Sequence, residues 1–144
     1  MSGLAALLAG HNPADLYRWH SATPVADVKH AVEHAGWSFR HLDGWVLEDK
    51  ASFLEAAAQA LGDGPVPSFD ALSDRLADVD ASESEGVVLL WDGWSPLARH
   101  DEQAFHVALS VLGGRANADR GCPFAVLLRG EGPHLDVPEL PARA

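Results

Sequence analysis

Three carboxylates near the middle of the chain are spaced so that they could act together. Asp70, Asp74 and Asp78 recur at every fourth position, and this spacing places them on one side of an α-helix. Such a row of negative charge could imitate the phosphates of a nucleic acid or bind a basic protein partner. It could also be an ordinary solvated face. The spacing alone leaves both interpretations open.

The helix that would carry this row is specified by its own sequence. Its apolar residues fall on the opposite side, which we expect to face the core: Phe69, Leu72, Leu76 and Val79. Ser68 is the expected N-cap, and Asp70 lies in the first turn, where the helix dipole favours a negative charge. The later acids oppose helix formation, because like charges four residues apart cost about 0.2–0.5 kcal/mol per pair. Arg75 is the single opposite charge among them.

Two other groups of residues could support enzyme chemistry. Asp43 and Asp92 each follow a predicted strand, and carboxylates at the ends of neighbouring parallel strands could hold Mg²⁺ for phosphoryl transfer. Each is followed by Gly-Trp, which is also typical of a simple strand exit. His30 and His34 flank Glu33 in the H-x-x-E-H pattern of zinc hydrolases, although a surface helix with two unrelated histidines explains them as well. We expect no catalytic residues, metal or cofactor, and keep the Mg²⁺ site as the alternative.

The composition indicates one acidic domain. The 144 residues are 47% hydrophobic, enough for a core. The net charge of −11 argues against direct binding to nucleic acid or to an anionic membrane, and favours a basic protein partner. The single Cys122 excludes an internal disulfide, and no apolar run reaches about 18 residues. Residues 4–9 are apolar but lack the preceding basic region of a signal peptide. We expect a cytoplasmic monomer.

The order of the predicted elements indicates an α/β fold. Strands are expected at residues 16–20, 37–42, 87–91 and 124–128, the last two being uninterrupted apolar runs that are typical of strands buried in a parallel sheet. Helices are expected at residues 2–8, from Thr23 and Pro24 to 36, from Asp49 or Ser52 to 62, within 65–85, and from Asp101 to about 111 or beyond, with Gly113 and Gly114 fraying or ending the last one. We predict a small, mostly parallel sheet of three strands, with a possible extra N-terminal strand, packed with helices.

The chain divides into three predicted parts. Residues 1–36 would be an N-terminal extension that packs on the core, and residues 37–129 would form the main domain. Residues 130–144 contain three prolines, Pro133, Pro138 and Pro141, which prevent regular structure. We therefore expect an exposed C-terminal tail.

The acidic helix and its flanks match a known pattern. Residues 69–76 read Phe-Asp-Ala-Leu-Ser-Asp-Arg-Leu, after a strand that ends in Leu-Asp-Gly and before the strand Val-Val-Leu-Leu-Trp-Asp. Over residues 37–129 this order resembles the barstar family of ribonuclease inhibitors. The resemblance implies a barstar-like fold and a non-enzymatic inhibitor, immunity protein or antitoxin that blocks the active site of a basic ribonuclease or nuclease toxin. It implies these partner-binding residues: Ser68, Phe69, Asp70, Ser73, Asp74 and Asp78. Asp74 aligns with the family carboxylate that occupies a phosphate position.

The sequence departs from the family pattern around this helix. Residues 63–68 replace the Tyr-x-Gly-x-Asn type loop that helps members plug the nuclease. Ser73 stands where some members present an aromatic residue, and an acid of the long helix is absent near Gly113 and Gly114. These differences imply a different cognate toxin or weaker inhibition. A further alternative is a degenerate interaction protein that kept the fold and has no nuclease target.

Overall fold

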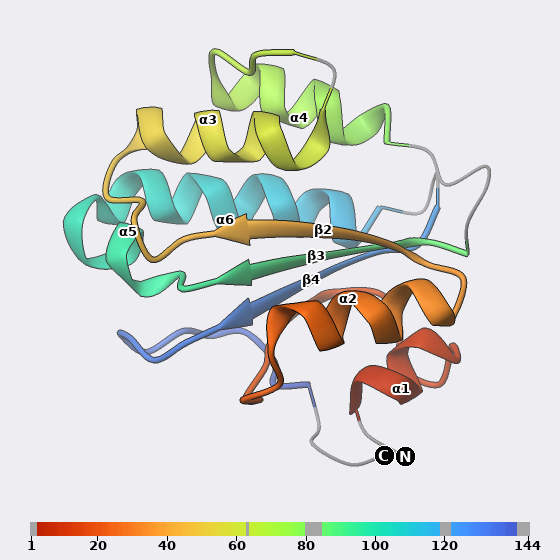
Figure 1. Cartoon of the computed structure of the whole chain (residues 1–144). Helices are drawn as coiled ribbons and strands as arrows, with labels where there is room; N and C mark the ends of the chain where they lie inside the picture. The colour runs from red at the N-terminus through yellow and green to blue at the C-terminus, as the bar shows by residue number, and fades with distance from the viewer. Residues whose placement is uncertain (1–2, 63, 80–84, 119–121, 141–144) are drawn as a thin grey trace.

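The computed structural model describes residues 3–62, 64–79, 85–118 and 122–140. A four-stranded sheet lies at the centre, with helices on both faces (Figure 1). Its strands are β1 (Leu16–Arg18), β2 (Ser38–Asp43), β3 (Val87–Asp92) and β4 (Phe124–Arg129), all parallel in the order β1-β4-β3-β2. The helices are α1 (Gly3–Leu8), α2 (Val25–His34), α3 (Lys50–Leu61), α4 (Phe69–Ala77), α5 (Ser95–His100) and α6 (Glu102–Ala116).

The helices form two layers around the sheet. Residues of α3, α4, α5 and α6 share one apolar cluster with one face of the sheet, and residues of α1 and α2 share a second cluster with the other face. The predicted α/β fold with a parallel sheet is therefore confirmed. The possible N-terminal strand is present as well: β1 pairs with β4, Leu16 opposite Val126.

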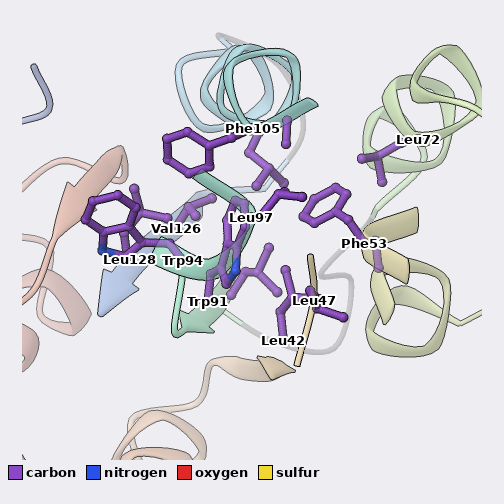
Figure 2. Close-up of a cluster of buried hydrophobic side chains, with 14 of the residues drawn as sticks. Leu42, Leu47, Phe53, Leu72, Trp91, Trp94, Leu97, Phe105, Val126 and Leu128 are labelled. Carbon is purple, nitrogen blue, oxygen red and sulfur yellow. The ribbon is translucent and has the colours of Figure 1, made fainter. Parts of the chain in front are cut away.

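The two central strands, β3 and β4, are apolar because both faces are covered. Along β3, Leu89 and Trp91 point into the cluster of α3 to α6, whereas Val88 and Leu90 point into the cluster of α1 and α2. Figure 2 shows Trp91 among the side chains of the first cluster. Its ring centroid lies 5.0 Å from that of Phe53 and 5.7 Å from that of Phe105. Consecutive apolar residues thus correctly predicted the buried strands.

Several predicted helix ends are confirmed and others are wrong. Asp49 and Ser52 together form a capping box at α3, and the Asp101 side chain accepts a hydrogen bond from the Ala104 amide at α6. Pro24, rather than Thr23, is the N-cap of α2. The sequence did not predict α5. Helix α6 also continues through the two glycines to Ala116, because Leu112, Arg115 and Ala116 are buried and packing outweighs low helix propensity.

The C-terminal segment is not the exposed tail that we expected. Leu135 and Leu140 are buried. The Leu140 amide donates a hydrogen bond to the Arg18 carbonyl at 2.8 Å, and the Arg18 amide donates to the Pro138 carbonyl at 2.9 Å. The prolines prevent a regular strand, but they leave the segment free to cover the outer edge of β1.

The repeated Asp-Gly-Trp sequence marks equivalent exits from β2 and β3. A Cβ atom on Gly44 would lie 2.1 Å from the Gly93 carbonyl oxygen, so the two exits approach as closely as glycine permits. Gly93 has a φ of 86°, and the Trp45 ring lies over it. Trp94 is buried, and its indole nitrogen donates to the Gly130 carbonyl at 3.2 Å. Both tryptophans therefore cover the carboxyl edge of the sheet.

An ion pair closes the same edge of the sheet. Two guanidinium nitrogens of Arg129 each donate to a carboxylate oxygen of Asp92 at 3.0 Å. The side chains are only 12% and 15% exposed. The hydrogen bonds from Arg129 are the main cause that lowers the pKa of Asp92 below its ordinary value, and burial partly opposes them. The ionised carboxylate therefore stabilises the fold.

Asp92→Asn should destabilise the protein by about 1.5–3 kcal/mol at neutral pH, because it removes a hydrogen-bonded charge. Since folding lowers the pKa of Asp92, its contribution is present above the unfolded pKa of about 3.9 and is lost as the pH falls through the folded value. Urea unfolding measures the difference in unfolding free energy between the variant and the wild type. This difference should be constant from pH 7 to about pH 4 and should narrow between pH 4 and pH 3. A difference that is absent at pH 7 would contradict this account.

Candidate functional site

Helix α4 forms as its sequence predicts. The Ser68 hydroxyl accepts a hydrogen bond from the Ala71 amide at 3.1 Å, so Ser68 is the N-cap. Leu72 and Leu76 are buried. The helix lies against α3 and α6, as Figure 1 shows for α3. It is therefore an outer element, whose position depends on the helices beneath it.

Four of the predicted binding residues face solvent. Asp70, Ser73, Asp74 and Asp78 are exposed, and Asp78 is the C-cap of α4. A further acid, at position 80, lies outside the described residues. The carboxylates of the described part of α4 thus face solvent.

Phe69 packs the start of α4 against α3. It is half-buried, and its ring centroid lies 6.0 Å from that of Phe53. The Lys50 ammonium lies 5.5 Å from the Phe69 ring centroid, within the range of a cation–π contact. Phe69 is therefore an anchor for the helix as well as a neighbour of the exposed acids.

Arg75 binds the segment that leads into α4. Its guanidinium donates to the carbonyl oxygens of Gly62 and Gly64, the latter at 3.1 Å, and to that of Pro65 at 3.4 Å. Gly62 is the C-cap of α3, where the helix dipole favours a positive charge. From sequence, Arg75 was expected to offset the neighbouring acids. In the structure its hydrogen bonds instead hold the connection between α3 and α4.

Arg115 holds the other end of α4. It is buried, and its Nε donates to the Leu76 carbonyl at 2.9 Å. A second nitrogen lies 3.1 Å from the Cys122 carbonyl and 3.4 Å from the Val79 carbonyl. The guanidinium carbon lies 5.0 Å from the centroid of the Phe124 ring. We missed this residue from sequence. The available signal was a cation on the apolar face of α6 that also carries Ala108 and Leu112.

These contacts leave the acidic row without an ion pair to any described residue. No ion pair in the described ranges includes Asp70, Asp74 or Asp78. The two nearby arginines give their hydrogen bonds to carbonyl oxygens. A row of exposed carboxylates without cationic partners produces a local negative potential that can attract a basic surface.

The alternative Mg²⁺ site is not favoured by the geometry. Asp43 and Asp92 are register partners at the ends of β2 and β3, as their positions in the sequence predicted. However, both carboxylate oxygens of Asp92 accept hydrogen bonds from Arg129, and Asp43 accepts one from the Trp45 amide. Within the described part of the chain, no three His, Cys, Asp or Glu side chains lie together as metal ligands.

The other patterns considered from sequence also have simple structural positions. His30 and His34 are exposed on α2, and their rings stack with centroids 6.0 Å apart.

The helices of the described ranges include none with the length and hydropathy needed to cross a membrane.

Arg115→Met should destabilise the protein by about 2 kcal/mol or more, because buried carbonyl groups at the end of α4 lose their donor. Urea unfolding measures this loss, and hydrogen exchange should show that the amides of α4 open before those of β3 and β4. Arg99→Met is the control, since Arg99 is exposed on α5 and its replacement should change stability by no more than about 0.5 kcal/mol. Equal effects of the two substitutions would refute a special role for Arg115.

Arg75→Lys should loosen the connection between α3 and α4, because an ammonium keeps the charge but lacks the planar fork. Backbone ¹⁵N relaxation should report lower order parameters at Gly64 and Val66. Arg40→Lys is the matched control, since Arg40 makes one long hydrogen bond, 3.4 Å, to the Ala60 carbonyl. Unchanged order parameters in Arg75→Lys would show that the fork does not fix this segment.

Comparison with known proteins assigns the family. The family described as Barstar (barnase inhibitor) matches residues 37–129, which is more than half of the chain. No curated protein and no solved structure matched the chain. Barstar family proteins are inhibitors of ribonucleases and not enzymes. The matched region begins just before β2, ends with β4 and includes the acidic helix, so the chain belongs to the barstar family.

Proposed function

We propose that this protein inhibits a basic ribonuclease or nuclease toxin by placing α4 in the enzyme's active site. The observation that carries the proposal is the row of exposed carboxylates, which form no ion pair within the described part of the chain, on a helix that is anchored at both ends. Membership in the barstar family supports a ribonuclease as the partner. An immunity protein or antitoxin would act in this way.

The mechanism has an electrostatic step and a docking step. The net charge of −11 attracts a basic enzyme over long range, and such steering can raise association rates to about 10⁸–10⁹ M⁻¹s⁻¹ at low salt. In the docked complex, Asp70 and Asp74 take the places of substrate phosphates among the enzyme's cationic groups. Asp78, at the end of the helix, contributes at the rim, where charges chiefly affect the association rate.

A rigid helix favours this replacement of substrate phosphates by carboxylates. A flexible acidic segment would lose conformational freedom on binding, and that loss would weaken the complex. Here Ser68, Phe69 and Arg115 fix the start and the end of α4 before a partner arrives. The carboxylates are therefore already arranged for binding.

The test is RNA hydrolysis by barnase, titrated with this protein at low and high salt. We expect stoichiometric inhibition that weakens as salt rises, because salt screens exposed charges. Asp74→Ala should weaken binding by about 2–5 kcal/mol, the usual loss when one partner of a buried charge pair is truncated. Asp27→Asn is the charge-matched control, since Asp27 is exposed on α2, across the sheet from α4.

One result would contradict the proposal, and a second would exclude one class of target. Inhibition that is unchanged in Asp70→Asn and Asp74→Asn would show that α4 does not enter the active site. Absence of inhibition at micromolar protein would exclude a barnase-type active site as the target.

A further inference from the structure

A groove separates the exposed edges of α4 and α6 beside the acidic row. Its volume is about 680 Å³. Leu76 and Arg115 are buried at its floor. Small exposed residues line its two sides: Ser73 and Ala77 from α4, and Ser110, Gly114 and Ala118 from α6 and the residues after it. The groove is therefore open because its walls carry short side chains.

Gly114 is not required by the fold. It lies inside α6 without a positive φ, and a Cβ atom at this position would have no heavy atom of the described residues within 4 Å, apart from its chain neighbours and the adjacent backbone of its own helix. Glycine in a helix interior is unfavourable relative to alanine, because it loses more conformational freedom on folding. A side chain at position 114 would, however, project beside the groove. The glycine thus lowers helix stability and keeps the groove open.

The two sides of the groove differ in charge. On α4, the exposed Asp70 and Asp74 lie three residues before the groove residues Ser73 and Ala77, and residues three apart are neighbours on a helix surface. On α6, Val107 lies on the same helix face as Ser110 and Gly114, and its side chain is 37% exposed. The rim from α4 is therefore acidic, and the rim from α6 is uncharged and partly apolar. The Arg115 cation lies at the floor between them, with its hydrogen bonds directed to carbonyl oxygens.

We propose that this groove receives an apolar side chain, preferably aromatic, that the partner carries next to Lys or Arg residues. The inference rests on the proposed function and specifies the partner surface. An aromatic ring is the largest apolar group that can enter such a space with little conformational entropy to lose. The cations beside it would lie against the carboxylates of α4. A second copy of this chain fits poorly, because two acidic rows would then approach each other.

The groove can be tested directly with two peptides, acetyl-Lys-Trp-Lys-amide and acetyl-Lys-Ala-Lys-amide. Titration of ¹⁵N-labelled protein should show tighter binding of the Trp peptide by about tenfold, as expected for a ring that becomes buried. The largest chemical-shift changes should occur at Ala77, Ser110 and Gly114. Equal affinities, or changes confined to another surface, would overturn the proposal.

Paired glycine substitutions supply the control. Gly114→Leu fills the groove and should abolish the preference for the Trp peptide. Gly113→Ala should retain it, because Gly113 does not line the groove and a Cβ there would make an ordinary 3.6 Å contact with Leu16. Both changes favour the helix, so both variants should fold. A preference that survives Gly114→Leu would reject the groove as the binding site.

The outcomes separate this inference from the proposed function. Asp74→Asn should weaken both peptides alike, since it removes the charge contribution only. Failure to inhibit barnase would count against the proposed target, and the peptide comparison would still decide the role of the groove. Self-association in sedimentation experiments that Gly114→Leu abolishes would assign the groove to a second copy and would also overturn the proposal.

Discussion

The position of the acidic helix depends on the buried guanidinium of Arg115. Helix α4 packs on α3 and α6, and Arg115 joins its last carbonyl groups to the segment that enters β4. A buried charge is costly unless hydrogen bonds satisfy it. The carbonyls of Leu76, Val79 and Cys122 meet that requirement, and the face of Phe124 adds a further favourable contact. One cation from α6 therefore ties the outer helix to the core.

Arg75 repeats this arrangement one helix earlier. Both arginines place a positive charge at the carboxyl end of a helix, Arg75 at α3 and Arg115 at α4, where the helix dipole favours it. Neither forms an ion pair with the acidic row among the described residues. The cations thus stabilise the scaffold while the carboxylates stay exposed. Repulsion between neighbouring acids costs the helix some stability, and anchoring at both ends offsets that cost.

Local sequence patterns predicted most helices and strands and the row of acids on α4. The roles of the two arginines, the C-terminal segment and the end of α6 depend on long-range contacts. The apolar runs of β3 and β4 and the caps at Ser68 and Asp101 depend on nearby residues, so they could be read from sequence. The roles of Arg75 and Arg115 depend on carbonyls 13 and 39 residues away. The docked C-terminal segment and the helical glycines of α6 likewise reflect packing that overrides local propensity.

Charge alone gives this surface little selectivity. A row of carboxylates attracts many basic proteins and chiefly raises the rate of encounter. Selectivity requires a feature that a wrong partner cannot match. Ser73 stands where some members of the family present an aromatic residue, and Gly114 lies near the place of a long-helix acid that some members use. In this chain both are small residues that line a groove. The projecting group would then come from the partner, and a basic protein without it would leave the groove unfilled.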